Sequence, residues 1–336
     1  MKSYDFSTPE LVEMSYLPNY SILPNDSIII RRFSTYYSPL SLDQLISMID
    51  RIPERNPRYV FIDYSPDDIP PYTQDEIQER IALFKRHFPN SQVILLTPQP
   101  DDYDTTQPDV LFYPYWFLNH PTEYPITVRK KRIGCLNRRN AAHRVWLMHN
   151  LLSQDLIDHK RDIFSMRFVN VFDKKTKADL SSWLPSISVE EQRFINRTYP
   201  ESIATVPDDF PNDHSVQHPA WNTALAIVTE TEVDHYCVIT EKTIKAFLSR
   251  SCFMLYTGQE ELDLLPKLGF ELGTFDQHAT EFNINPILDM ARKLDTESVA
   301  LDYYHSKLDI INHNYDWFTT GGWLSKYQEK LKLFVE

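Results

Sequence analysis

Glycine and cysteine are scarce in this sequence, and both scarcities exclude functional classes. Only 6 of the 336 residues are glycine, and none of them forms G-x-G-x-x-G or G-x-x-x-x-G-K-S/T, the loops that cradle phosphates in many nucleotide-binding proteins. The three cysteines, Cys135, Cys237 and Cys252, have no C-x-x-C spacing and leave an odd count, which is typical of a reducing compartment. If this protein binds phosphate, a glycine-rich loop is not the means.

Long apolar runs and a net positive charge are also missing. The N-terminus lacks a basic start followed by an apolar run, and no stretch approaches about 18 uninterrupted apolar residues. We therefore expect no signal peptide, no membrane span and a cytoplasmic location. The formal net charge is −13, which argues against attraction of the whole surface to phosphate backbones or anionic lipid. The histidines show no H-E-x-x-H spacing, so a zinc site is not expected.

Short apolar runs alternate with helical patterns, which indicates an α/β protein with mainly parallel sheets. Residues 27–33, 58–64 and 91–99 read as strands, with helices between them. The alternation restarts at 132–137 and continues through 223–232 and 252–258, and the stretch 260–270 reads as a short helix that ends at Gly269. Residues from 285 onward read as helices, with one of them over 298–318. The length and the basic stretch at 128–132 favour two domains, 1–127 and 128–336.

The stretch CVITEKTIKAFLSRSCFMLYTG places polar groups at the start of an otherwise apolar helix. Thr240 is a plausible N-cap, and Ile244 begins a core stripe at i, i+3, i+4 spacing. Glu241 and Lys242 then lie at the mouth of a strand-to-helix loop, where open α/β sheets bind ligands. Glu241 can accept hydrogen bonds from a sugar or ribose diol, and Lys242 with the amides of the helix start can hold a diphosphate. The alternative is a capped helix with an ion pair between Glu241 and Lys245.

A second polar cluster lies upstream, in CLNRRNAAHRVWLMHNLL. Asn137, Arg138 and Arg139 follow one strand directly and precede a helix that carries His143 and Arg144. Guanidinium groups match phosphate oxygens bidentately, so this cluster can supply the chemistry of a glycine-rich loop. The alternative is a solvated basic turn that pairs with some of the 47 acidic residues.

Together these segments resemble the donor-binding motifs of the α1,3-fucosyltransferase family. TALAIVTETEVDHYCVITEKTIKAFLSRSCFMLYTG is similar to that family's FALAFENS strand, VTEK core and terminal glycine, and the upstream segment resembles its SNCNAxSxRxxYxxxL pattern. The resemblance covers residues 133–260. The matched positions are Ala224, Leu225, Ala226, Val238, Thr240, Glu241, Lys242, Gly258, Asn137 and Arg144.

The resemblance implies a GT-B glycosyltransferase, with two Rossmann-like domains facing a cleft and C-terminal helices. It implies that the C-terminal domain binds a nucleotide-sugar donor without a metal or other cofactor. Arg144 would contact the donor diphosphate with help from Lys242, and Glu241 would contact ribose or sugar hydroxyls. Glu230 aligns with the motif's glutamate after a one-residue insertion, because this chain has VTETE where the family has ENS.

The N-terminal half would then bind the acceptor and carry a general base. An inverting transfer needs a carboxylate or imidazole that removes the proton of the acceptor hydroxyl. Asp63 ends the predicted strand YVFID and is the candidate, with a turn-capping role as the alternative. Asp102-x-Asp104 matches a metal-binding pattern, but it lies in a proline-rich loop, so we expect solvated carboxylates and no metal there.

Two functional classes follow. The first is a glycosyltransferase that acts on a glycan, a small glycoside or a modified base of phage DNA. The second is a non-catalytic module that binds a nucleotide-sugar or a glycan. The sequence leaves the nucleotide, the sugar and the stereochemistry of transfer open.

Overall fold

The chain forms two compact units. The computed structural model describes residues 2–5, 12–14, 22–31, 42–53, 56–63, 74–97, 109–118, 129–137, 140–168, 187–199, 202–205, 222–230, 239–272, 278–280 and 283–335. The first unit comprises residues 1–120 together with 328–336, and the second comprises residues 121–327. The predicted domain boundary after residue 127 falls within residues 119–128, which lie outside the described part of the chain.

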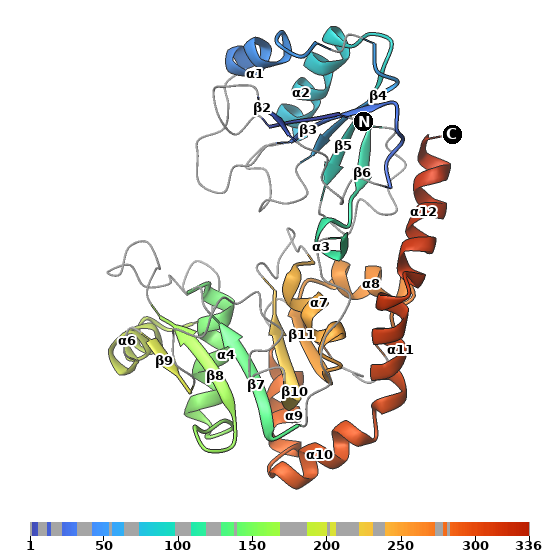
Figure 1. Cartoon of the computed structure of the whole chain (residues 1–336). Helices are drawn as coiled ribbons and strands as arrows, with labels where there is room; N and C mark the ends of the chain where they lie inside the picture. The colour runs from blue at the N-terminus through green and yellow to red at the C-terminus, as the bar shows by residue number, and fades with distance from the viewer. Residues whose placement is uncertain are drawn as a thin grey trace. The chain divides into compact units, whose positions relative to one another are not determined.

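The first unit contains a six-stranded sheet in the order β2-β1-β3-β4-β5-β6 (Figure 1). Every neighbouring pair is parallel except β1 with β2. Its strands are β1 (Lys2–Asp5), β2 (Val12–Met14), β3 (Ser27–Arg31), β4 (Tyr59–Asp63), β5 (Gln92–Thr97) and β6 (Val110–Phe112), and its helices are α1 (Leu42–Ile49), α2 (Gln74–His87) and α3 (Tyr115–Leu118).

Helices α1 and α2 pack on one face of this sheet. Leu45 and Ile49 of α1 and Phe84 of α2 share one buried cluster with strand residues such as Ile28 and Val60. The strands from β3 to β6 follow one another in chain order, so right-handed crossovers place both helices on the same face. The expected βαβ alternation is confirmed here, whereas β1 and β2 were missed because KSYD and VEM contain no apolar run.

The second unit contains a six-stranded sheet in the order β12-β11-β10-β7-β8-β9. Only β9 runs antiparallel to its neighbour. The strands are β7 (Lys131–Asn137), β8 (Ile163–Arg167), β9 (Ser202–Ala204), β10 (Thr223–Thr229), β11 (Phe253–Thr257) and β12 (Ala279–Thr280). The helices are α4 (Ala142–Ser153), α6 (Val189–Thr198), α7 (Glu241–Leu248), α8 (Gln259–Lys267), α9 (Asn285–Lys293), α10 (Glu297–His305) and α11 (Leu308–Thr319). The last helix, α12 (Gly322–Val335), begins in this unit, and its residues from 328 onward belong to the first unit.

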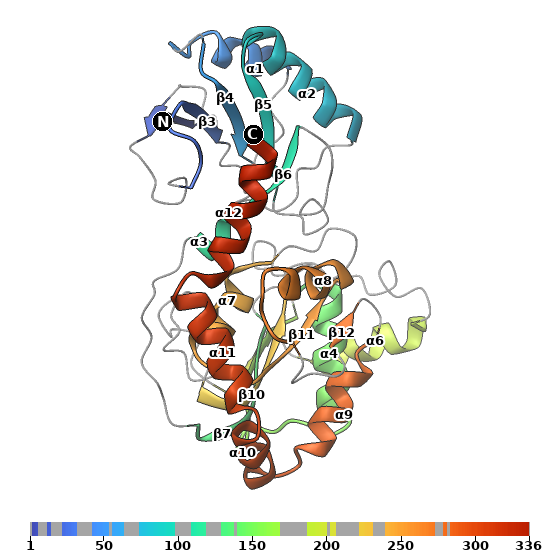
Figure 2. The ribbon, with the colours of Figure 1, turned by 90° about the vertical axis from the view of Figure 1, so that its right-hand side faces the viewer.

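This second sheet is doubly wound around the pair β7 and β10. From β7 the chain runs through α4 to β8 on one side, and from β10 it runs through α7 to β11 on the other. Right-handed crossovers then place α4 and α7 on opposite faces, and Figure 2 shows α4 with α9 on one side of the sheet and α7 with α11 on the other. β7 and β10 are hydrogen-bonded neighbours, with Ile227 opposite Cys135. Their carboxyl ends form a topological switch point, where ligands bind in open α/β sheets.

The C-terminal helices differ from the sequence prediction in one respect. Residues 298–318 were expected to form one helix, but α10 ends at His305 and α11 begins at Leu308. The amide of Lys307 donates to Tyr304 O at 3.0 Å, an i−3 bond that tightens the last turn, and Lys307 itself has non-helical dihedrals. The apolar pattern continues across this break, so periodicity alone did not reveal it.

Trp317 of α11 packs tightly against the backbone that follows α8. Its indole nitrogen donates to Leu268 O at 2.8 Å, and a Cβ added to Gly269 would lie 2.6 Å from the same nitrogen. Gly269 also has a φ of +93°. It ends α8 as the sequence predicted, with bonds from Gly269 N to Pro266 O and from Phe270 N to Leu265 O, the Schellman arrangement.

Gly269→Ala is therefore expected to lower the free energy of unfolding by about 2 to 5 kcal/mol, because a left-handed backbone penalty adds to overpacking against Trp317. Gly321→Ala is the matched control, since Gly321 has a φ of +77° but the nearest atom to its added Cβ is 4.0 Å away. It should cost only the backbone penalty of about 1 to 2 kcal/mol. Urea denaturation of the two variants measures the difference, and equal losses would contradict the packing role of Trp317.

Among the described residues, no helix is long and apolar enough to cross a membrane.

Candidate functional site

The two strand-to-helix mouths identified in the sequence meet at the switch point. Asn137 is the last residue of β7 and Thr229 is the last residue of β10, and the Thr229 hydroxyl donates to Asn137 Oδ1. The amide of Asn137 donates to Cys135 Sγ at 3.2 Å. Burial raises the pKa of that thiol to about 12, so Cys135 is a structural partner rather than a nucleophile. Asn137 therefore joins the ends of the two strands.

Helix α4 reaches across from β7 to the end of β10. Arg144 Nη2 donates to Glu230 O at 2.7 Å and to Thr229 O at 3.3 Å. His143 Nε2 lies 3.1 Å from the same carbonyl of Glu230, which makes it the protonated ring nitrogen and the donor. Both side chains are buried. These bonds hold the start of α4 against the end of β10.

Glu230 caps the start of α7 from within the protein. Its side chain is fully buried and its Oε1 accepts from Thr240 N at 3.2 Å, from Thr243 N at 3.3 Å and from Thr243 Oγ1 at 2.6 Å. The Thr240 hydroxyl donates to Oε2. A carboxylate at a helix N-terminus satisfies unpaired amides and matches the helix dipole. The predicted N-cap at Thr240 is confirmed, since its hydroxyl also accepts from Lys242 N.

This cap changes what the start of α7 can offer a ligand. The amides of Thr240, Lys242 and Thr243 already have acceptors within the chain, although the sequence assigned the helix amides to a diphosphate. The side chains of Glu241 and Lys242 are 15% and 24% exposed. The Lys242 ammonium lies 3.7 Å from Glu241 Oε1 and 3.8 Å from Glu230 Oε2. These two side chains, rather than the backbone, are positioned to meet a charged or hydroxylated ligand.

The start of α4 is the other strand-to-helix mouth of the site. Its N-cap, Ala141, provides no side-chain hydrogen bond to the helix. His143 in the first turn of α4 and the Lys242 ammonium both approach Glu230, at 3.1 Å from its carbonyl oxygen and 3.8 Å from its Oε2. The N-terminus of the helix after the first strand of a doubly wound sheet is the usual pyrophosphate position. Lys242 and the first turn of α4 thus lie near the same point, outside the ends of β7 and β10.

His143 is held neutral at this point. Burial, Arg144 and Lys242 lower its pKa to about 3, so it adds no positive charge to the cluster. Its ring packs edge-on against Tyr256 of β11, with centroids 5.5 Å apart. His278 is also held neutral, because burial lowers its pKa to about 4, and its Nδ1 accepts from Leu255 N at 3.2 Å.

These two histidines are expected to make the protein less stable in acid. Both folded-state pKa values lie below the value of about 6.5 in the unfolded chain, so the stability they contribute is complete above pH 6.5 and is lost as the pH falls toward 4 and 3. Each histidine should lower the free energy of unfolding by about 1 kcal/mol between pH 7 and pH 5.5. In a His143→Gln/His278→Asn variant, the glutamine can still donate to Glu230 O and the asparagine can still accept from Leu255 N, but neither side chain titrates. Between pH 7 and pH 5.5 this variant should lose about 2 kcal/mol less of its free energy of unfolding than the wild type, as measured by urea denaturation. An unchanged pH dependence would contradict the neutral buried state.

Three buried residues at this site were not among the predicted site residues: Thr243, Thr257 and Glu261. Glu261, in the first turn of α8, is fully buried and accepts from Thr243 Oγ1 at 3.0 Å and from the Thr257 hydroxyl. Thr257 is the last residue of β11. The available signals were the i, i+3 spacing of Thr240 and Thr243 and an acidic residue in the first turn of the helix after β11, patterns that are also common in ordinary capped helices.

The remaining predicted residues lie elsewhere. Arg138, Arg139, Asp102 and Asp104 lie outside the described residues. Asp63 is the last residue of β4 in the first unit, as predicted, and it is fully buried. Within the described part of the chain, no group of three or more His, Cys, Asp or Glu side chains could hold a metal ion.

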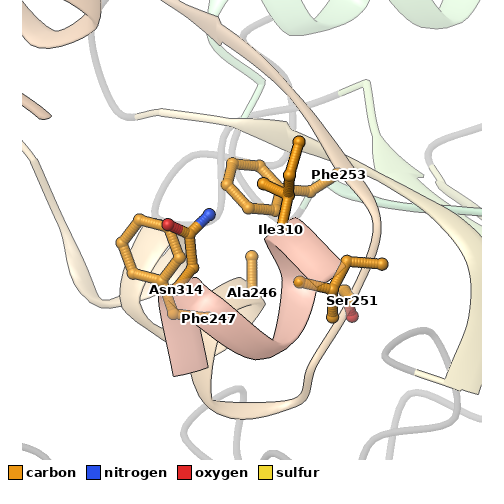
Figure 3. A pocket seen from close by; sticks show the side chains of 7 residues that line it. Ala246, Phe247, Ser251, Phe253, Ile310 and Asn314 are labelled. Atoms are coloured by element: carbon orange, nitrogen blue, oxygen red, sulfur yellow. The ribbon is translucent and has the colours of Figure 1, made fainter. Parts of the chain in front are cut away.

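A small cavity between α7, β11 and α11 is not part of the switch point (Figure 3). Ala246, Phe247, Phe253 and Ile310 give it a mainly apolar lining. Asn314, which also lines it, donates to Glu271 O at 2.9 Å and accepts from Glu271 N at 2.8 Å. Its amide therefore anchors the chain after α8, and the cavity reflects packing between the two helices.

No family model matches the chain, and no curated protein sequence matches it. The chain is similar to two solved structures. One is T4 phage BGT in complex with its UDP-glucose substrate, with 12% identity, a TM-score of 0.44, and coverage of 93% of this chain and 83% of that one. The other is the DNA-modifying enzyme beta-glucosyltransferase, with 12% identity, a TM-score of 0.43, and coverage of 92% and 81%. At this identity and TM-score, we infer the function from the residues of this chain. The resemblance to α1,3-fucosyltransferases stays a prediction.

Proposed function

We propose that this protein is a GT-B glycosyltransferase that binds a nucleotide-sugar at the β7–β10 switch point. One observation carries the proposal: the two polar mouths, about a hundred residues apart in the sequence, are joined by bonds from Arg144 and His143 to the Glu230 carbonyl. The donor diphosphate would lie between the first turn of α4 and the ammonium of Lys242. Glu241, beside Lys242, would accept hydrogen bonds from ribose or sugar hydroxyls.

The roles of the buried residues follow from their bonds. Asn137, Arg144 and Glu230 would hold the walls of the donor site, because their hydrogen bonds run to strand ends and helix starts. In the reaction, the bond between the anomeric carbon and the diphosphate oxygen breaks and a bond to the acceptor oxygen forms. The nucleoside diphosphate leaves, and the acceptor proton passes to a base.

An inverting transfer needs a general base for the acceptor hydroxyl. Asp63 is the proposed base for an inverting transfer, yet its side chain is fully buried, which favours a structural role. This burial supports a second candidate, a module that binds a nucleotide-sugar without transferring it. The acceptors proposed for the enzyme remain a glycan, a small glycoside or a modified base in DNA.

A two-step experiment tests the proposal. Thermal shift with GDP-, UDP-, CMP- and dTDP-sugars, each with and without EDTA, identifies a donor, because only ligands of the native state raise the melting temperature. Release of the free nucleotide, a nucleoside diphosphate or, from a CMP-sugar, CMP, is then measured with glycoside, glycan and DNA acceptors. Release that depends on an acceptor supports the transferase, and binding without release supports the module. No shift with any nucleotide-sugar would overturn both.

A further inference from the structure

The hydroxyl of Thr243 lies between two buried carboxyl groups. Its oxygen is 2.6 Å from Glu230 Oε1 and 3.0 Å from Glu261 Oε1, and both glutamates are fully buried. A threonine hydroxyl has one hydrogen and can donate to only one of them. The other contact is a hydrogen bond only if the second carboxyl group supplies the proton.

The geometry assigns the threonine hydrogen to Glu230. The contact to Glu230 is the shorter of the two, and the same oxygen accepts from the amides of Thr240 and Thr243. The Lys242 ammonium lies 3.8 Å from the other oxygen of Glu230. Amide donors and a nearby cation stabilise an ionised carboxylate, whereas two carboxylates that share one site favour a single negative charge.

We infer that Glu261 is a neutral carboxylic acid that donates a hydrogen bond to Thr243 and thereby positions the first turn of α7 for the donor. The part that concerns the donor rests on the proposed function. Glu261 acts through Thr243 and is a positioning residue rather than a catalytic one. Sequence analysis and the comparisons assigned it no role.

A chain of hydrogen bonds connects Glu261 to the ligand-facing residues. Thr257 at the end of β11 donates to Glu261 Oε2, Glu261 bonds Thr243, and Thr243 donates to Glu230. Thr240 also donates to Glu230. Lys242 lies between Thr240 and Thr243, so the backbone that carries its ammonium is fixed on both sides.

Two substitutions of Glu261 distinguish a neutral acid from a carboxylate. The amide of Glu261→Gln has one donor for Thr243 and one acceptor for Thr257, so it reproduces the neutral acid. Glu261→Leu removes both bonds. If Glu261 were instead an ionised acceptor of two hydroxyl protons, the glutamine would present an N–H group to one of them and would lose that bond.

The experiment measures hydrogen exchange of residues 239–248 without ligand, together with the Kd of the nucleotide-sugar found by thermal shift. We expect Glu261→Gln to match the wild type within about twofold. Glu261→Leu and Thr243→Val should speed exchange and weaken binding by about tenfold or more, the effect of losing a hydrogen bond in a network that holds a charge. Thr223→Val, at the opposite end of β10 and equally buried, is the matched control and should change neither quantity. Thr243→Val keeps the test valid if Glu261→Leu does not fold.

Faster exchange in Glu261→Gln, equal to that in Glu261→Leu, would overturn the neutral-acid assignment. Unchanged exchange in Thr243→Val would overturn the positioning role. If exchange follows the prediction but the wild type binds no nucleotide-sugar, the hydrogen-bond chain stands and the proposed function fails.

Discussion

Replacing Lys242 with methionine is expected to weaken nucleotide-sugar binding roughly 10- to 100-fold. The Lys242 side chain is 24% exposed and its ammonium would donate to a diphosphate, and a hydrogen bond to a charged group contributes about 1.5 to 3 kcal/mol. The ammonium also donates to Thr240 Oγ1 at 3.1 Å and lies 3.8 Å from the fully buried Glu230 carboxylate, so the melting temperature of the free protein is expected to fall as well. Calorimetric titration of the donor measures the loss of affinity.

Two controls test whether binding depends on a positive charge at residue 242 in particular. Lys131→Met removes a lysine at the opposite end of the same sheet, where its ammonium donates to Lys160 O, and should leave the affinity unchanged. Lys242→Arg keeps the charge and should retain most of the binding. A Lys242→Met protein that binds the donor like the wild type would contradict the placement of the diphosphate.

Arg132→Met is expected to lower the free energy of unfolding by about 3 to 5 kcal/mol, because it leaves a buried charge unpaired. Arg132 forms a two-point ion pair with Asp162, at 3.0 Å and 2.6 Å, and both side chains are almost completely buried. Its guanidinium also donates to Leu294 O at 2.8 Å and Ala291 O at 3.3 Å, which ties the C-terminal end of α9 to β7. Urea denaturation, read out by tryptophan fluorescence, measures the loss.

A double variant identifies the cause of that loss. Asp162 Oδ1 accepts from Ile133 N at 3.0 Å, and an asparagine can keep this acceptor without the charge. Arg132→Met/Asp162→Asn should therefore be more stable than Arg132→Met alone. A single variant within about 1 kcal/mol of the wild type would show that the buried pair is not needed, as occurs when a site relaxes around the change.

The sequence predicted the local parts of the site well. The apolar spacing of Ile244, Phe247 and Leu248 gave the buried face of α7, and all three side chains are almost fully buried. Thr240 was identified as the N-cap because its type and its place before the stripe are both local signals. The α/β class followed from alternating apolar runs for the same reason.

The long-range parts could not be predicted from these patterns. The neighbour relation of β7 and β10 depends on strand pairing across about ninety residues, and it brings Arg144 to the Glu230 carbonyl. Glu230 was a candidate ligand contact because it aligns with the glutamate of the fucosyltransferase motif, but its carboxylate caps α7, whose N-cap Thr240 lies ten residues later. Glu261 was not recognised, because an acidic residue in the first turn of a helix is common and its partner Thr243 lies on another helix.

A crystal structure with the nucleotide-sugar that gives the largest thermal shift tests the central claim most directly. We expect the diphosphate at the carboxyl ends of β7 and β10, within hydrogen-bond distance of Lys242 Nζ and beside the first turn of α4, with sugar or ribose hydroxyls at Glu241. A donor bound at any other place, with the Lys242 ammonium still directed to Thr240, Glu230 and Glu241, would contradict this placement.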